Sequence, residues 1–138
     1  DELTSECLAR TIKLLQTRGM QVWILRQVPE QRDDVPRSLA LARYWDWNAD
    51  AVSTTLTDYN SAQRSADHIF STAASDSVRV LDVASVFFRD SERCRVQSAG
   101  RPLYSDDDHL SQAGALELAA ILLPLYKAAA ATTPSLEQ

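Results

Sequence analysis

The apolar positions at the start of the chain predict a helix followed by a buried strand. Leu8, Ile12 and Leu15 recur three or four residues apart, which is the spacing of one helical face. Gly19 follows them as a cap of the helix C-terminus. The run Val22–Leu25 contains no polar position, which predicts a strand buried on both faces. A helix followed by such a strand indicates an α/β unit.

A second helix and strand follow further along the chain. Pro36 is well placed to open a short helix, because its missing N–H would be unpaired in a first turn anyway. A single apolar stripe predicts a longer helix over residues 58–74, and alternating valines with Leu81 predict a strand over residues 78–83. Only these two strands are evident, and a sheet commonly has more. The pattern therefore predicts an α/β fold with a parallel sheet that is part of a larger domain.

The last third of the chain is predicted to be a loop and a helix. Residues 85–108 are mostly polar and are interrupted by Gly100 and Pro102, which indicates a long ordered loop. Ser111 can cap a final helix that Pro124 should kink or end. We expect residues 1–130 to form the folded unit and residues 131–138 to form a flexible tail.

Composition fits one globular domain and excludes some partners. The chain has 138 residues, of which 45% are hydrophobic. Lys and Arg total 14 against 19 Asp and Glu, and this net charge of −5 argues against a nucleic acid or an anionic membrane surface as partner. The apolar runs are too short to span a bilayer. Cys7 and Cys94 lie far apart, so they predict no zinc or redox motif and are either one long-range disulfide or two buried thiols.

The densest chemical signal is the acidic segment that ends at His109. Asp106, Asp107 and Asp108 precede this histidine, between the loop and the start of the final helix. A carboxylate three residues before a histidine can hold one ring nitrogen and leave the other free to accept a proton. The alternative is a solvated acidic loop that caps a helix. The spacing lacks the alternating ligands and glycine of a calcium loop, so we predict no metal. Acid-base chemistry by such a pair needs no cofactor, and we predict none.

Other chemically distinctive residues have structural explanations. Trp45 and Trp47 can stack on sugar rings, but clustered aromatic residues are more often a satellite core. His68 is expected on the helix surface without a role. Cys94 lies between Arg93 and Arg95 but has no histidine or second cysteine nearby, so a structural role is favoured.

The block Tyr104 to Ala115, Y-S-D-D-D-H-L-S-Q-A-G-A, resembles the C-terminal catalytic block of SGNH hydrolases. The similarity is to the form fused to membrane acyltransferases of family three, and it extends over most of residues 3–126. It implies a three-layer, parallel-sheet, flavodoxin-like SGNH fold, with Asp106 orienting His109 as the general base. The family's nucleophilic serine lies in a Gly-Asp-Ser block, which this sequence lacks. We therefore expect a domain that is incomplete at its N-terminus, in preference to a degenerate relative.

The resemblance also implies a function and a location. The expected function is a segment of an envelope O-acyltransferase that acetylates a surface polysaccharide or lipopolysaccharide through a Ser-His-Asp mechanism, with the serine outside this chain. The segment alone is expected to be inactive. An acyl donor and a glycan acceptor are the implied partners, on the periplasmic side of the bacterial inner membrane, with membrane contact only through a transmembrane region elsewhere in the protein. The alternative is a noncatalytic α/β binding or interaction module whose contact surface is the acidic loop with Trp45 and Trp47.

Overall fold

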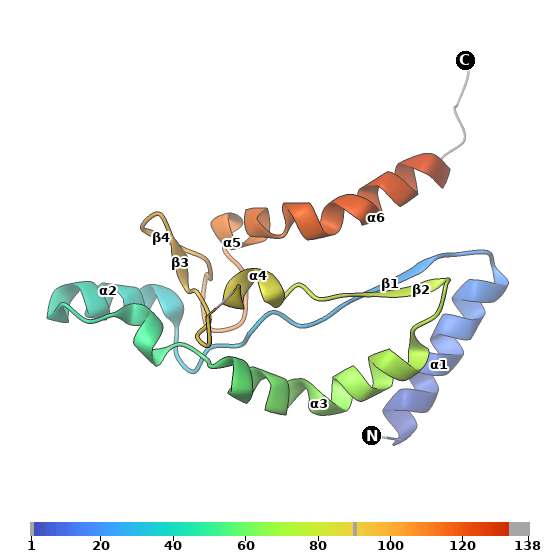
Figure 1. Ribbon diagram of the computed structural model, residues 1–138, viewed down its shortest axis with the longest axis horizontal. Coiled ribbons are helices and arrows are strands. Elements are labelled where there is room, and N and C mark those ends of the chain that lie inside the picture. The colour runs from blue at the N-terminus through green and yellow to red at the C-terminus, as the bar shows by residue number, and fades with distance from the viewer. Residues whose placement is uncertain (1, 90, 133–138) are drawn as a thin grey trace, which may run out of the picture.

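The computed structural model describes residues 2–89 and 91–132. The elements follow the predicted alternation of helices and strands (Figure 1). In chain order they are α1 (Glu2–Thr17), β1 (Val22–Leu25), α2 (Val35–Trp45), the 3-10 helix η1 (Ala49–Val52), α3 (Leu56–Ala73), β2 (Val78–Leu81), α4 (Ser85–Phe88), β3 (Gln97–Ser98), β4 (Arg101–Pro102), α5 (Gln112–Glu117) and α6 (Ala119–Thr132).

A small parallel sheet forms the centre of this mixed α/β fold. Strands β1 and β2 pair in parallel, with Val22 opposite Val78 and Leu25 opposite Leu81. The chain between them passes through α2, η1 and α3, as a parallel connection requires. In Figure 1, α1 and α3 run along one side of the strands and α6 runs along the other. The predicted α/β class with a parallel sheet is confirmed.

Strand β1 is less buried than its sequence predicted. Its first three residues are half-buried, and Leu25 is 44% exposed. The expectation of a strand buried on both faces was wrong, because the described residues that pack on the sheet cover the side chains of β1 only in part. An apolar sequence alone does not show how completely the rest of the fold covers a strand.

The hydrophobic core lies beyond the carboxyl ends of the strands. Its centre is made of α4 and the segment before α5, where Phe87, Leu103 and Tyr104 are fully buried. The predicted long loop over residues 85–108 is therefore wrong in part, because burial of Phe87 and Phe88 folds the short helix α4. The loop also contains the hairpin of β3 and β4. Leu103 and Tyr104 directly precede the acidic segment, so their burial attaches that segment to the core.

The C-terminal helix keeps its predicted cap but is divided, whereas a single helix was predicted. Ser111 caps it as expected, since its Oγ accepts a hydrogen bond from the Gly114 amide at 3.2 Å. The single helix is divided into α5 and α6 at Leu118, and α6 continues past Pro124 to Thr132. Of the predicted tail, residues 131 and 132 belong to α6 and residues 133–138 lie outside the described residues. No helix within the described ranges is both long and apolar enough to cross a membrane.

The two cysteines are free thiols, and only one of them is buried. Cys94 lies in the core, whereas Cys7 is exposed on α1. The prediction of two buried thiols therefore fails for Cys7, and the alternative of a long-range disulfide is not what the structure shows.

Candidate functional site

Residues 104–110 form a closed turn, called here the acidic turn. Tyr104 pairs with Leu110 in an isolated antiparallel bridge at its base. Inside this bridge, the Ser105 amide donates a hydrogen bond to the His109 carbonyl at 2.8 Å. Next to this bridge, the Ser111 hydroxyl donates a hydrogen bond to the Pro102 carbonyl at 2.7 Å. Short-range backbone contacts thus fix the shape of the segment that carries the carboxylates.

Gly114 allows helix α5 to start directly against the base of the acidic turn. A Cβ atom at this position would lie 2.0 Å from the Leu103 carbonyl oxygen and 3.2 Å from a methyl carbon of Leu110. Because real Cβ atoms do not approach a backbone oxygen so closely, only glycine fits without moving the helix. The glycine in the block that resembles the SGNH family therefore has a packing role.

The acidic turn is attached to the loop that leaves strand β1. The Gln31 amide donates to the Asp107 carbonyl at 2.8 Å, and the Val35 amide donates to the Asp106 carbonyl at 3.1 Å. Since Gln31 and Val35 follow the end of β1, the turn lies at the carboxyl edge of the parallel sheet. Ligand and catalytic sites of open α/β sheets commonly occupy this edge.

Asp106 makes contacts with both the backbone and the ring of His109. One carboxylate oxygen, Oδ1, accepts hydrogen bonds from the His109 amide at 2.7 Å and the Asp108 amide at 3.0 Å. The other, Oδ2, lies 2.9 Å from Nδ1 of the imidazole. The backbone hydrogen bond from His109, the largest contribution, helps to hold the pKa of Asp106 below its ordinary value. The carboxylate is therefore ionised at neutral pH and oriented toward the ring.

Asp108 is a second acidic neighbour of the imidazole that the sequence interpretation missed. Its Oδ1 lies 2.7 Å from Nδ1 of His109, closer than Asp106, although only the Asp106 contact has hydrogen-bond geometry. We assign the orienting role to Asp106 for that reason, and a charge contribution to Asp108. The Asp106 hydrogen bond, followed by the charges of Asp106 and Asp108, raises the pKa of His109. The position of Asp108 immediately before His109 was the sequence signal that could have revealed this contact.

This arrangement leaves one nitrogen of His109 available for proton transfer. With Nδ1 facing the two carboxylates, the neutral ring carries its proton on Nδ1, and Nε2 has a free lone pair. Nε2 makes no hydrogen bond with a residue that the structure describes, and the side chain is 74% exposed. Such an imidazole can act as a general base. Ligand atoms of Asp106, Asp108 and His109 also lie within 4.8 Å of one another, so these three could hold a metal ion.

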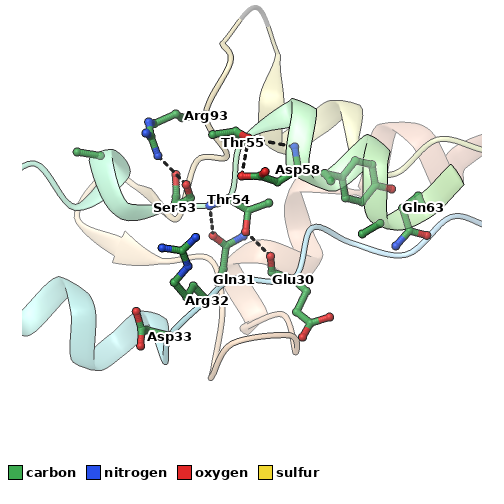
Figure 2. A pocket seen from close by; sticks show the side chains of 13 residues that line it. Glu30, Gln31, Arg32, Asp33, Ser53, Thr54, Thr55, Asp58, Gln63 and Arg93 are labelled. Atoms are coloured by element: carbon green, nitrogen blue, oxygen red, sulfur yellow. Dashed lines mark hydrogen bonds between the residues drawn. The ribbon is translucent and has the colours of Figure 1, made fainter.

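A cleft of about 570 Å³, lined mostly by polar and charged residues, lies beside the loop that follows β1 (Figure 2). It is formed by the loop after β1, the segment before α3, the first turns of α3 and Arg93. Buried Gln31 joins two of these segments, since its Nε2 donates to the Pro29 carbonyl at 2.8 Å and its Oε1 accepts from the Thr54 amide at 3.1 Å. No sequence motif marked Gln31 or Thr54. Asp106 and His109 do not line this cleft, which the Gln31 amide links to the turn.

Three further sequence predictions are resolved by burial. Trp45 and Trp47 are 58% and 59% exposed, so the satellite-core interpretation is wrong. His68 is exposed on α3, as predicted. Cys94 is fully buried, and burial raises the pKa of its thiol, which agrees with the predicted structural role.

Comparison with known families identifies the chain. Residues 1–124 match the family described as the SGNH domain fused to AT3 domains, that is, to acyltransferase-3 domains. The chain belongs to this SGNH domain family. No curated protein and no solved structure matches it. Family membership makes this SGNH domain an acyltransferase-associated, hydrolase-like module, and its Asp106-x-x-His109 segment lies within the matched residues.

Proposed function

We propose that this SGNH domain is part of an envelope O-acyltransferase that transfers an acyl group, acetyl in the simplest case, to a hydroxyl group of a surface polysaccharide or lipopolysaccharide. The observation that supports this most directly is the 2.9 Å contact between Asp106 Oδ2 and His109 Nδ1, which leaves Nε2 free at the carboxyl edge of the sheet. Fusion of the family to acyltransferase-3 domains supports the acyl group as the transferred moiety.

The proposed chemistry has two steps with His109 acting in both. Nε2 accepts the proton of a serine hydroxyl as the serine oxygen attacks the acyl carbonyl, and it returns that proton to the departing group of the donor. An acyl-serine ester remains. Nε2 then accepts the proton of a sugar hydroxyl, whose oxygen attacks the ester carbonyl, and protonates the serine as it leaves. Asp106 stabilises the imidazolium that forms transiently in each step.

The serine comes from chain outside these 138 residues in this proposal. The sequence contains no Gly-Asp-Ser block, and β1 has one strand neighbour within the described residues. Further strands on the free edge of β1, together with the helices that connect them, would complete a three-layer, flavodoxin-like fold and cover Leu25. An exposed His109 leaves room for the serine and the oxyanion donors to approach. The parent is a membrane protein, with this domain on the periplasmic side of the bacterial inner membrane.

A noncatalytic binding module is the second candidate. It is favoured by the 74% exposure of the His109 side chain outside the large cleft, and by the exposed Trp45 and Trp47. In that case the acidic turn and the two tryptophans would form the contact surface, and the SGNH fold would be kept without its reaction.

Hydrolysis of 4-nitrophenyl acetate distinguishes the two candidates. We would assay this chain and a version extended toward its N-terminus, each as the native sequence and as His109→Ala. The enzyme hypothesis expects turnover only in the extended version, and loss of about a thousandfold with His109→Ala. Asp107→Asn, a neighbouring change outside the hydrogen-bonded pair, is the matched control and should retain most of the activity. If both folded versions are inactive, the binding module is the better description.

A further inference from the structure

An aromatic cluster at the end of helix α2 lies open to solvent beside a polar groove. Tyr44, Trp45 and Trp47 are 78%, 58% and 59% exposed. The indole rings of Trp45 and Trp47 stack with centroids 6.5 Å apart, and Tyr44 packs edge-on against Trp45 at 4.9 Å. Three adjacent exposed aromatic rings are unusual on a soluble surface, because apolar patches of this kind are normally covered or functional.

The backbone positions Trp47 over the helix. Asp46 adopts a left-handed conformation with φ of 55°, which ends α2. The Trp47 amide then donates to the Ala42 carbonyl at 2.8 Å, so the chain folds back along the helix. As a result, Trp47 and the neighbouring Asn48 line a groove of about 270 Å³ whose other walls are residues of α2 and of the loop before it. Stacking on Trp45 restricts the orientation of the Trp47 ring before any ligand binds.

The groove carries free hydrogen-bonding groups of both kinds. The Arg37 guanidinium and the Asp33 carboxylate make no hydrogen bond or ion pair with another described residue. The Asn48 side-chain oxygen accepts from the Asp50 amide, which leaves its amide protons available. Donors, an acceptor and an aromatic face therefore converge on one groove. Because acidic Asp33 and Asp34 accompany the single cation, the groove does not favour a multiply charged anion.

A pyranose ring matches this combination. One face of the ring presents C–H groups that pack on the π face of an indole, and its rim presents hydroxyl groups that donate and accept. Pockets of this type obtain specificity from a few convergent polar groups around an apolar surface.

The groove is also placed near the acidic turn. Asp33 lines both the groove and the large cleft, and Figure 2 shows it on the loop that carries Gln31 and Arg32. Two residues later, the Val35 amide binds the Asp106 carbonyl. A glycan bound in the groove would therefore contact the loop whose amides hold the acidic turn, which carries the proposed catalytic pair.

We propose that the groove between Trp47 and Asp33 is a glycan-binding subsite that holds one pyranose unit of the acceptor. That the bound sugar is the acceptor rests on the proposed acyl transfer. Sugar binding itself can be measured without any reaction.

The test follows the indole N–H signals of the chain by nuclear magnetic resonance while methyl pyranosides of glucose, galactose, rhamnose and N-acetylglucosamine are added. There are three tryptophans, and Trp23, which packs under Arg79 on the sheet, is an internal reference. We expect a saturable shift of the Trp47 signal with at least one pyranoside and no shift for Trp23. Trp47→Ala should weaken binding about tenfold, as judged by backbone amide shifts. Arg37→Ala should weaken it severalfold without removing a ring.

The control is Tyr126→Ala, which removes an exposed aromatic residue on α6 and should leave binding unchanged. Absence of a saturable shift with every pyranoside overturns the proposal, as does binding that survives both groove substitutions. Indole shifts that depend on protein concentration alone, with dimers in sedimentation, would assign the patch to a second copy and also overturn it. Sugar binding retained by His109→Ala in a protein without acyl transfer would reject the proposed function only. Acyl transfer without sugar binding would reject the groove only.

Discussion

The acidic turn and the adjacent cleft contain similar polar groups but are assembled in different ways. In the turn, Asp106 binds amides two and three residues ahead, and Ser105 binds His109 four residues ahead. In the cleft, Gln31 binds Thr54 and Cys94, which are 23 and 63 residues away along the chain. The turn is thus shaped by its own sequence, whereas the cleft depends on the folding of three distant segments. A local motif can be recognised in a sequence, and a cleft of this kind cannot.

The two regions also differ in what their hydrogen bonds contribute to stability. The side chains of the acidic turn are partly exposed, so water replaces their partners when a contact is lost. Gln31 is 5% exposed, so its partners would be left unsatisfied in the interior. We therefore expect substitutions in the turn to change chemistry and substitutions in the cleft to change stability.

The largest expected effect is on the proposed catalysis by Asp106 and His109. In a version extended toward the N-terminus, the proposed mechanism predicts that Asp106→Asn lowers kcat for acetyl-ester hydrolysis by about a thousandfold, because the neutral amide no longer stabilises the imidazolium. Asp108→Asn should have a smaller effect, since Asp108 contributes charge without a hydrogen bond of good geometry. Equal losses for the two variants would contradict the assignment of the orienting role to Asp106.

The next effect is on stability at the base of the turn. Gly114→Ala should lower the free energy of unfolding by about 3 kcal/mol, because the new Cβ overlaps the Leu103 carbonyl. Gly100→Ala is the matched control, with open space around the Cβ and a φ of 73°. It should cost about 1–2 kcal/mol, the strain of a left-handed residue. Urea denaturation followed by circular dichroism measures both, and a smaller cost for Gly114→Ala would refute the packing role.

In the cleft, Gln31→Leu should lower the free energy of unfolding by about 2 kcal/mol, since the Thr54 amide and the Pro29 carbonyl lose their buried partner. Gln63→Leu changes the same residue type on the same cleft, where the side chain makes a single 3.3 Å hydrogen bond to Gln27. This control should change stability by less than about 0.5 kcal/mol. Similar values for both variants would mean that Gln31 does not hold the cleft together.

The smallest effect concerns the pH dependence of the acidic turn. Titration of His109 followed by nuclear magnetic resonance should give a pKa above the ordinary value of 6.5, and Asp106→Asn should lower it more than Asp107→Asn does. The folded-state pKa of His109 is raised, so the protonated ring stabilises the fold slightly. This contribution is present in full at a pH below the unfolded-state pKa and is lost as the pH rises through the folded-state pKa. The contribution of Asp106, whose pKa is lowered, is lost as pH falls through its folded value.

Several features followed from local pattern and were therefore predictable. The segments that form β1 and β2, the Ser111 cap and the Asp106–His109 pairing depend on residues that are neighbours in sequence. Family resemblance in the block around His109 agrees with the matched SGNH family. The prediction of a continuous loop before this block failed because Phe87 and Phe88 are buried by distant partners, and local polarity does not reveal such burial.

The sequence by itself determined the α/β class and the pairing of Asp106 with His109, because these depend on periodicity and on hydrogen bonds between near neighbours. The resemblance of the block Tyr104 to Ala115 indicated the family. Only the tertiary structure decided that β1 stays half-buried, that Trp45 and Trp47 are exposed, and that Gln31 joins loops far apart in the chain. The physical reason is that burial and long-range hydrogen bonds depend on which segments the fold brings together, a property that no local window of sequence contains.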